Sequence, residues 1–417
     1  MKDFESDQNI YDNVDALDPE PDMYTPDSLP EREDELSTIH SALRPITMEG
    51  SPRNLLVYGP TGQGKTVAVD IKTNQLQEWA QNEEGVSLTV LWASCKGAGK
   101  SWNVLADLVQ AARKERRGPG ASKPRGRTKI ELFELLTQEL EKIGGTILIV
   151  LDEIDGITED NYILYELPRA DVPGIQLGVI GITNDLQFRD GLDTDVQSSL
   201  ASREVVFSPY DANQLRNILS RRAVHALQNT SFEGGIQNSS HLRSEVLSNE
   251  VVPYCAAKAG QNTGDARQAI RLLSTACDRA LDNRETKVSK EHVEQAEEEL
   301  WAKTVGKEII GETIQRKLAL LTVLEAEVYG ETPESTTELY QRYDRFTTAI
   351  DAETYSRATF RKKLNDLSHG NILNGDRRGR GRGKGMTNQY GLAIDQEIVI
   401  EKLREDSRLE PLFDIIL

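Results

Sequence analysis

Residues 59 to 66 restrict the fold of this chain more than any other segment. Gly59-Pro60-Thr61-Gly62-Gln63-Gly64-Lys65-Thr66 is a complete GxxxxGK[ST] match. It follows the apolar run from Asn54 to Tyr58 and precedes a helical segment that starts with Val67, whereas a chance glycine turn before a lysine would lack both neighbours. Strand, glycine-rich loop and helix form a phosphate-binding loop, since glycines and a helix N-terminus present N–H donors without side chains in the way.

The loop predicts binding of ATP or ADP by the residues from Gly59 to Val67. Lys65 is expected to neutralise the β and γ phosphates and to serve as a catalytic residue. The Thr66 hydroxyl is expected to bind Mg²⁺.

Four more strands are predicted, at Leu88 to Ala93, Thr146 to Leu151, Leu177 to Thr183 and Val205 to Phe207. The segments between them are long enough for helices. This alternation predicts a mostly parallel sheet with helices on both faces. From Asp211 the strand signal disappears, and the stretches 214–227 and 266–281 have helical spacing, which indicates a helical domain after the sheet.

The segment from Thr146 to Asp155 (TILIVLDEID) is an apolar strand that ends in acidic residues, as expected of a Walker B segment. Asp152 is predicted to hold the magnesium ion and Glu153 to polarise the attacking water. Acidic residues after a buried strand are otherwise common helix caps. The phosphate-binding loop upstream favours the catalytic interpretation.

Two further positions are candidates for the same site. Asn184 follows the strand 177–183 and is a candidate catalytic residue, since it would lie beside the γ-phosphate and the attacking water if the sheet has the strand order of AAA+ proteins. Arg267 lies in Gly264-Asp265-Ala266-Arg267, where Asp265 can cap a helix and leave Arg267 free to reach the phosphates. A loop asparagine and a solvated helix arginine are the alternatives.

The charge of the chain is uneven. The 49 basic and 68 acidic residues give a net charge of −19, which argues against a protein that coats nucleic acid. Residues 1–35 hold two basic against thirteen acidic residues, and we expect them to form a disordered acidic tail. The acidic remainder, with more arginine than lysine, is typical of a protein kept soluble at high salt.

Cysteine usage and hydropathy indicate a soluble protein of the cytoplasm. Cys95, Cys255 and Cys277 lie far apart without a CxxC pair, so neither a disulfide framework nor a zinc site is expected. The longest apolar run is too short to span a membrane, and the acidic N-terminus is unlike a signal peptide.

The C-terminal end carries a candidate DNA-binding surface. A helix is predicted from Tyr355 to Leu367, with Ser356 as its cap and with Arg361 and Lys362 pointing away from its apolar face. After it, residues 374–389 begin with an Asn-Gly turn and hold cations among glycines, as in a wing that lies on phosphates or in a minor groove. These cations are Arg377, Arg378, Arg380, Arg382 and Lys384. A solvated basic linker is the alternative.

A second basic stretch runs from Arg113 to Lys129 and contains eight basic residues and one glutamate. Its glycines and prolines indicate a flexible surface loop before a helix over 130–143. A solvated loop and a second DNA contact remain open for this stretch.

The motifs, their order and their spacing resemble the archaeal relatives of origin recognition complex subunit one and cell division control protein six. Features more specific than the phosphate-binding loop carry the resemblance: Leu29-Pro30-Glu31-Arg32, Pro52-Arg53-Asn54, Ser198-Ser199-Leu200 and Phe207-Ser208-Pro209-Tyr210. The likeness spans nearly the whole chain beyond the acidic tail. It implies that Tyr210 and Arg222, together with Arg267, contact the nucleotide where the sheet meets the lid.

The chain departs from the family at one position. Such proteins carry an arginine in a leucine-aspartate-proline-arginine-valine segment, whereas this chain reads Leu192-Asp193-Thr194-Asp195-Val196. An arginine finger acting on a neighbour's ATP is therefore in doubt. Arg189 and Arg203 are the possible substitutes, although neither has the matching spacing.

We predict an α/β fold in four parts: the acidic tail (1–35), an AAA+ parallel-sheet domain (36–208), a helical lid (209–304) and a C-terminal winged helix (305–417). The resemblance implies a weak, switch-like ATPase at the nucleoid that binds double-stranded origin DNA, recruits the replicative helicase and can self-associate on DNA. An ADP-locked DNA-binding regulator without turnover is one alternative. A remodeller of the clamp-loader kind is another, and the basic wing argues against it.

Overall fold

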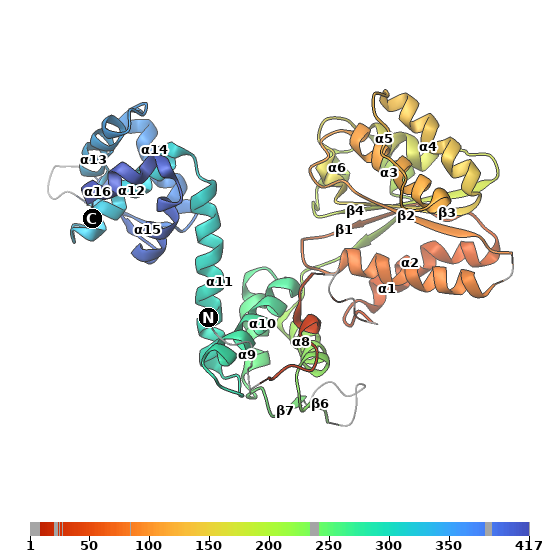
Figure 1. Cartoon of the computed structure of the whole chain (residues 1–417), viewed down its shortest axis with the longest axis horizontal. Coiled ribbons are helices and arrows are strands. Elements are labelled where there is room, and N and C mark those ends of the chain that lie inside the picture. Colours follow the sequence, from red (N-terminus) through yellow and green to blue (C-terminus); the bar gives the residue numbers. More distant parts are fainter. Residues whose placement is uncertain are drawn as a thin grey trace. The chain divides into compact units, whose positions relative to one another are not determined.

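The computed structural model describes residues 9–20, 24, 26, 28–83, 85–233, 242–379 and 386–416. The chain divides into two compact units, Met1–Glu294 and Gln295–Leu417 (Figure 1). Helix α11 (Lys290–Gly311) crosses the division, so the expected boundary at 304/305 falls inside a continuous helix. Within the described ranges, no helix is long and apolar enough to cross a membrane.

The first unit is built on a sheet of five parallel strands in the order β2-β3-β4-β1-β5. The strands are β1 (Leu55–Tyr58), β2 (Leu88–Ser94), β3 (Gly145–Asp152), β4 (Ile175–Thr183) and β5 (Arg203–Val206). All five are expected from the sequence, and their ends differ by a few residues at most. The order places β1 between β4 and β5, so that the phosphate-binding loop leaves the sheet beside the end of β4.

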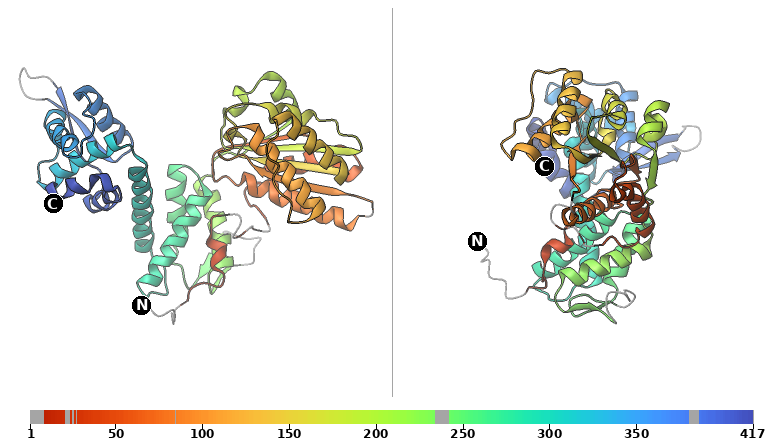
Figure 2. Two further views of the ribbon diagram at one scale, coloured as in Figure 1. Left: turned by 45° about the horizontal axis from the view of Figure 1, so that its top comes forward. Right: turned by 90° about the vertical axis from the view of Figure 1, so that its right-hand side faces the viewer.

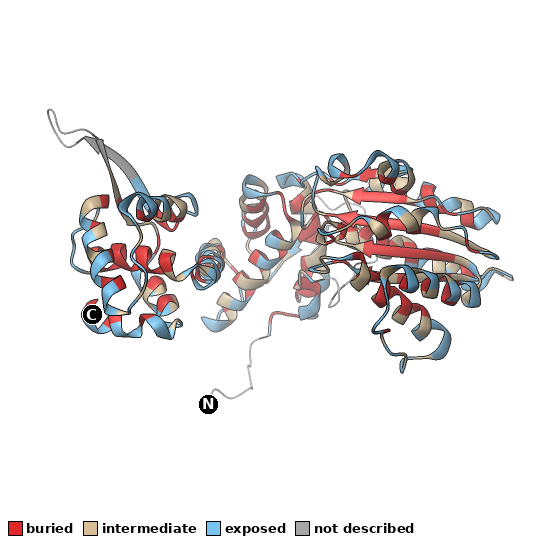
Figure 3. Cartoon of the chain, turned by 90° about the horizontal axis from the view of Figure 1, so that it is seen from above, coloured by how far each residue is buried: buried red, intermediate tan, exposed pale blue. Residues whose placement is uncertain are grey.

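Side chains of successive strand residues point to opposite faces of this sheet, and both faces are covered. Leu148 and Val150 of β3 pack in the core between the sheet and helices α1 (Glu33–Leu43) and α2 (Lys65–Asn82). Ile147 and Ile149 pack in a second core on the other face, as Figure 1 shows for the helices involved. The helices of that face are α3 (Ser101–Arg117), α4 (Lys129–Ile143), α5 (Tyr162–Glu166), α6 (Phe188–Gly191) and α7 (Thr194–Leu200). Figure 3 accordingly shows strands that are buried along their length between helices with one exposed side.

Short 3-10 turns complete this part of the chain. They are η2 (Arg44–Met48), η3 (Ile154–Gly156) and η4 (Leu167–Arg169). The turn η3 directly follows the Walker B strand, and the residue before it, Glu153, has a φ of 55°. The backbone therefore bends sharply at the proposed catalytic glutamate.

The lid is helical, as expected, but it also contains a small hairpin that the sequence does not predict. Its helices are α8 (Ala212–Ala226), α9 (Val251–Asn262), α10 (Ala266–Asp282) and the start of α11. Asp211 caps α8 with a capping box, and Asp265 caps α10 as predicted. The hairpin pairs β6 (Thr230–Phe232) with β7 (Leu242–Ser244), strands too short to show an alternating pattern.

The expectation of a disordered tail over 1–35 is wrong for residues 9–20 and 28–35, since helix α1 already begins at Glu33 and the earlier segment contacts the lid. Main-chain N–H groups of Asp12 and Asn13 donate to Ala226, and the turn η1 (Val14–Leu17) lies along the lid helices (Figure 2). Ile10 and Leu17 are buried against the lid. Burial of these two apolar side chains offsets the conformational entropy that the segment loses when it is ordered. The acidic composition of the segment gives no sign of them, and for this reason the sequence predicted disorder.

The second unit is a winged-helix arrangement. Its elements are α12 (Ile314–Val328), β8 (Glu334–Ser335), α13 (Thr336–Ala349), α14 (Arg357–His369), β9 (Leu373–Gly379), β10 (Met386–Leu392), α15 (Gln396–Arg404), η5 (Ser407–Leu409) and α16 (Glu410–Ile416). The sheet order is β8-β10-β9. The helical spacing of Ile314, Leu318, Leu321 and Leu324 predicts one apolar face, and in α12 the three leucines are fully buried while Ile314 is half-buried. Ser356 caps α14 by accepting from the Thr359 N–H, also as predicted.

The predicted Asn-Gly turn at 374–375 is wrong, because both residues belong to strand β9. Asn374 pairs with Gly391 and Gly375 with Tyr390 of β10. A Cβ on Gly375 would lie 2.8 Å from Oγ of Ser368, so the glycine allows α14 to approach the strand. The wing hairpin therefore begins with a paired strand, and its connection lies outside the described residues.

The basic stretch 113–129 is also more ordered than expected. Arg113, Arg116 and Arg117 lie on α3 and surround the Glu139 carboxylate of α4, which is 2% exposed. The loop itself starts at Gly118, and its main chain accepts hydrogen bonds from Gln110 and Trp102. Part of the positive charge of this stretch thus neutralises a buried carboxylate.

Candidate nucleotide site and DNA-binding face

The phosphate-binding loop is enclosed so closely that its glycines are required. Gly59, Gly62 and Gly64 all have positive φ angles. A Cβ on Gly59 would lie 2.2 Å from the Phe207 carbonyl oxygen, and one on Gly62 would lie 1.7 Å from Oδ1 of Asp265. The loop is therefore held between Phe207, which follows strand β5, and Asp265 at the N-terminus of lid helix α10.

Lys65 folds back over this loop. Its Nζ donates to the carbonyl oxygens of Gly59 at 2.7 Å and Pro60 at 2.6 Å, and to Oδ1 of Asn184 at 2.8 Å. Burial lowers the pKa of Lys65 to about 8, Asp152 opposes the shift and Arg267 adds to it. Two of the predicted catalytic residues, Lys65 and Asn184, are thus in direct contact.

Thr66 and Asp152 form the pair expected of a magnesium site. The Thr66 hydroxyl donates to Oδ2 of Asp152 at 3.0 Å. Burial raises the pKa of Asp152, and the hydrogen bonds from Thr66 and the Glu153 N–H oppose that rise. A hydroxyl and a carboxylate are oxygen ligands of the kind Mg²⁺ uses when phosphates and water complete its coordination.

Glu153 lies at the edge of the same cavity. Its side chain is 31% exposed, and Oε1 is 3.8 Å from Nζ of Lys96. Lys96 also lines the cavity and is not singled out by the sequence, because it lies in a loop without a motif. The geometry leaves the Glu153 carboxylate accessible to water.

Asp155 is a site residue that the sequence does not single out beyond its place in the strand motif. Its Oδ1 accepts from the Thr183 hydroxyl at 2.7 Å and from the Asn184 N–H at 3.2 Å. The carboxylate therefore fixes the end of β4, from which Asn184 reaches Lys65. The signal is the second aspartate of DEID, whose partner only the strand order reveals.

Arginines from the lid line the other side of the cavity. Arg222, predicted by resemblance, donates to the Ala16 carbonyl oxygen at 3.1 Å and stacks over the Tyr24 ring. Burial lowers its pKa. Arg267 lines the cavity from α10, as predicted. Arg221 is not predicted, although it too lines the cavity and its buried Nε has no hydrogen-bond partner among the described residues.

Tyr210 lines the cavity but is tied to the protein itself. Its hydroxyl donates to the Gln63 carbonyl oxygen at 3.1 Å, and its N–H donates to the Gly264 carbonyl oxygen at 3.1 Å. Gln63 in turn donates to the same Gly264 oxygen. The tyrosine therefore joins the phosphate-binding loop to the lid.

The cavity enclosed by these groups has a volume of about 470 Å³, within the usual range of small-molecule sites. Pro19, Glu20, Tyr24, Pro26 and Leu29 close one side of it, so the N-terminal segment, expected to be a disordered tail, contributes a wall. A phosphorylated ligand would fit the donors of this cavity, which are the backbone N–H groups of the glycine-rich loop, Lys65 and three arginines of the lid. The apolar Tyr24, Ile218 and Ile270 fit an aromatic base.

The structure brings a different arginine to the position where the family's arginine is replaced. Asp195 is exposed at the start of α7, and its carbonyl oxygen accepts from the guanidinium of Arg169. Arg169 is itself exposed and stacks on the Tyr165 ring at 4.0 Å. Arg203 is exposed on strand β5, and the Arg189 side chain lies outside the described residues.

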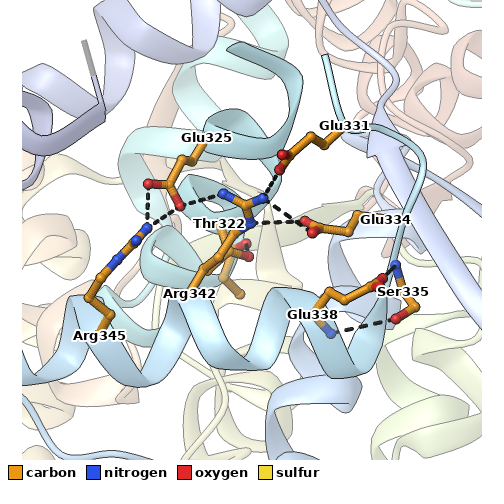
Figure 4. Close-up of polar contacts among 9 residues, drawn as sticks. Thr322, Glu325, Glu331, Glu334, Ser335, Glu338, Arg342 and Arg345 are labelled. Atoms are coloured by element: carbon orange, nitrogen blue, oxygen red, sulfur yellow. Dashed lines mark hydrogen bonds and ion pairs between the residues drawn. The ribbon is translucent and has the colours of Figure 1, made fainter. Parts of the chain in front are cut away.

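Among the side chains that the structure describes in the second unit, the basic ones outside α14 are mostly paired with acids. Figure 4 shows the densest group, in which Glu325 of α12 bonds to Arg342 and Arg345 of α13 while Arg342 also reaches Glu331 and Glu334. The Glu325 carboxylate is 1% exposed. The other paired cations are Lys303, Arg316, Lys317, Lys402 and Arg408.

Helix α14 differs from the rest of this unit. Arg357, Arg361 and Lys362 are exposed and have no carboxylate partner among the side chains that the structure describes. The acid of the helix, Asp366, is neutralised by Arg316 of α12 at 2.9 Å. Phe360, Leu364 and Leu367 hold its opposite face in the core. The helix thus presents free positive charge in fixed directions, as predicted for Arg361 and Lys362.

The wing residues are only partly placed. Arg377 and Arg378 lie in strand β9, paired with Asn388 and Thr387, while Arg380, Arg382 and Lys384 lie outside the described residues. Their roles therefore remain predictions.

Comparisons with known proteins agree with this anatomy. Residues 28–172 match the AAA ATPase domain family, residues 238–298 the Cdc6 AAA+ ATPase-type lid domain, and residues 307–402 the CDC6 C-terminal winged helix domain. The AAA ATPase match establishes a nucleotide-binding domain.

The chain is 38% identical to ORC1-type DNA replication protein 1 of Haloarcula marismortui, over 99% of this chain and 97% of that protein. It is 38% identical to ORC1-type DNA replication protein 10 of Halobacterium salinarum, over 82% and 79%. Both relatives come from halophilic archaea, in keeping with the acidic composition.

Among solved structures, the Aeropyrum pernix ORC1 protein in complex with DNA is 32% identical. The match covers 98% of this chain and 100% of that one, with a TM-score of 0.74. The Aeropyrum pernix ORC2 protein, solved as ADPNP–ADP complexes, shares the fold at 17% identity and a TM-score of 0.56.

Proposed function

Because the chain belongs to the family of ORC1-type DNA replication proteins, we propose that it initiates replication by binding duplex DNA at an origin under the control of ATP. The observation that carries this proposal is the free positive charge of α14, because the other cations of that unit whose side chains the structure describes are mostly paired. Free positive charge gathered on one helix of an acidic protein suits a DNA-facing surface. The ORC1 relative of known structure was solved in complex with DNA.

The nucleotide would be held by the groups already in contact around the loop. Lys65 and the loop N–H groups would meet the phosphates, and the arginines of the lid would approach from the other side. Thr66 and Asp152 would hold Mg²⁺, which neutralises phosphate charge when bound. Asn184 is positioned by Asp155 to contact both Lys65 and the phosphate region.

Glu153 would orient and polarise the attacking water, since its carboxylate follows Asp152 at the cavity edge and, unlike that of Asp152, makes no hydrogen bond to the phosphate-binding loop among the described residues. Hydrolysis is expected to be slow and to act as a switch. An exposed arginine from a second copy would be needed for faster turnover, and Arg169 is the arginine adjacent to Asp195. We also propose that the protein self-associates on DNA and recruits the replicative helicase, and this part of the proposal rests on family membership alone.

The proposal is tested by mixing the purified full chain with sheared genomic DNA of its source organism and sequencing the bound fragments with ATP or ADP present. We expect enrichment of a few sites and a loss of that enrichment when Arg361 and Lys362 are both changed to alanine. Each specific base contact typically contributes about 1–3 kcal/mol of discrimination. The matched control is Lys307→Ala, which removes an exposed cation of the same unit outside α14.

Uniform recovery of fragments by the parent chain would contradict the origin-binding proposal. Enrichment that is identical in ATP and ADP, without measurable turnover, would favour the ADP-locked regulator.

A further inference from the structure

Glu31 and Arg32 lie where the N-terminal segment, the phosphate-binding loop and the lid meet. Neither is a predicted nucleotide contact, and Arg32 is 3% exposed. A fully buried guanidinium is costly unless all of its donors are used. The hydrogen-bond partners of Arg32 therefore indicate which segments this residue holds together.

Arg32 bonds to both the phosphate-binding loop and the segment that follows strand β5. Its Nε donates to the Gln63 carbonyl oxygen and its Nη2 to Gln63 Oε1, each at 3.3 Å. Nη2 also donates to the Ser208 carbonyl oxygen, and Nη1 to Glu35. The guanidinium carbon lies 3.8 Å from the centre of the Tyr210 ring.

Gln63 and Tyr210 carry these contacts on to the lid. Both donate to the carbonyl oxygen of Gly264, the residue before the cap of α10. The Ala266 N–H donates to the Gly62 carbonyl oxygen at 3.2 Å. A Cβ on Gly264 would lie 2.6 Å from the Tyr210 carbonyl oxygen, so the two segments cannot shift past each other freely.

Glu31 makes a separate link to the lid. Its Oε1 accepts from Nδ2 of Asn217 on α8 at 2.7 Å. Its backbone has a φ of 68°, which is uncommon for a non-glycine residue. Two adjacent residues thus join α8 of the lid to the phosphate-binding loop.

We infer that Glu31 and Arg32 form a latch that holds the lid against the phosphate-binding loop and sets the rate at which bound nucleotide leaves. The inference rests on the proposed function, since it describes the regulation of the same site. The cavity is lined on one side by the loop and on the other by α8 and α10. Release requires these sides to separate, and the latch resists that separation. The two residues are positioning residues, because neither lines the cavity in this structure.

The first test measures the dissociation rate of the fluorescent probe mant-ADP from the full chain by stopped-flow displacement. Arg32→Met is expected to accelerate release at least about tenfold, the equivalent of one charge-assisted hydrogen bond. Arg32→Lys is expected to behave like Arg32→Met, because an ammonium group keeps the charge but not the planar fork or the stacking. The matched control is Arg44→Met, an exposed arginine directly after the same helix α1.

The second test uses the Glu31–Asn217 contact, whose removal should not prevent folding. Glu31→Ala and Asn217→Ala are each expected to accelerate release several-fold, and the double variant no further, as contact pairs couple. Glu31→Gln should release at the parent rate because its amide oxygen still accepts the hydrogen bond. Asn213→Ala, one turn away on α8, is the control.

Unchanged release rates in Glu31→Ala and Asn217→Ala, with mant-ADP bound normally, would overturn the latch and leave the proposed function intact. Additive effects of the two changes would also overturn it, since they would show that the residues act separately. If the parent chain binds no mant-ADP, the proposed function fails and the latch fails with it.

Discussion

The nucleotide pocket and helix α14 both depend on cations, but they hold them in opposite ways. In the pocket, Lys65 is buried and bonded to protein oxygens, and Arg222 is bonded to the N-terminal segment. On α14, Arg361 and Lys362 are exposed and lack carboxylate partners among the described side chains. A ligand in the pocket must replace existing contacts, whereas DNA at α14 replaces only water and salt ions.

The two sites should therefore respond to different variables. Affinity in the pocket should depend on geometry and on the protonation of a buried group. Affinity at the DNA face should depend on salt, because exposed cations act by releasing counterions. Changes at one site should therefore leave the response of the other site intact.

The largest effect is expected from Lys65→Ala. In this variant the charge-assisted bonds to two phosphates are lost, which should weaken ATP and ADP binding by roughly 1,000-fold. The contrasting variant Glu153→Gln should bind both nucleotides like the parent chain but should not hydrolyse ATP. Calorimetric titration measures the first effect and phosphate release the second. Normal hydrolysis by Glu153→Gln would contradict the Walker B assignment.

Next is Glu325→Gln, which probes the paired cations of the second unit. Removing a charge from a buried carboxylate that holds two arginines should destabilise that unit by about 3 kcal/mol. Hydrogen exchange should accelerate in α12 and α13 and stay unchanged around the phosphate-binding loop. Glu308→Gln, an exposed glutamate of α11, should change neither region; equal exchange in the two variants would show that the network contributes nothing.

A smaller effect is expected when Arg378, Arg380 and Arg382 are changed together to alanine. Binding to specific and random duplexes should weaken alike, less so as salt rises, and the salt slope should flatten by about 0.9 for each phosphate that the variant no longer neutralises. Fluorescence anisotropy over a salt series measures this. Parent-like binding at every salt concentration would mean that the basic hairpin is a solvated loop.

The smallest effect concerns pH. Burial lowers the pKa of Lys65 to about 8 in the nucleotide-free chain, and bound phosphates favour its charged form and hold its pKa higher. Affinity for ADP should therefore be insensitive to Lys65 below pH 7 and fall by up to about tenfold per pH unit above 8, with proton uptake on binding. Calorimetry at pH 9 in buffers of different ionisation enthalpy measures that uptake. Lys65→Arg, which stays charged, should remove the pH dependence, and a slope that persists in this variant would assign it to another group.

Several features follow from the sequence alone because they are local. The phosphate-binding loop, the Walker B strand, the caps Asp265 and Ser356 and the exposed face of α14 depend on residues a few positions apart. Their periodicity and turn chemistry can be recognised without knowing where the chain goes next. The domain types could therefore be predicted from the sequence, and most of the residues predicted for the nucleotide site line one cavity.

Other features could not be predicted from the sequence and are seen only in the tertiary structure, since they join residues far apart in the chain. The ordered segment at 9–20, the contact of Asp155 with Asn184 and the placement of Arg169 beside Asp195 are such cases. So is the latch, where Glu31 meets Asn217 and Arg32 meets Ser208. No local pattern encodes these pairs, because each arises only when the strand order and the packing of the lid bring separate segments together. An arginine is written in the same way in the sequence whether its guanidinium group is buried or solvated, and only the fold distinguishes the two cases.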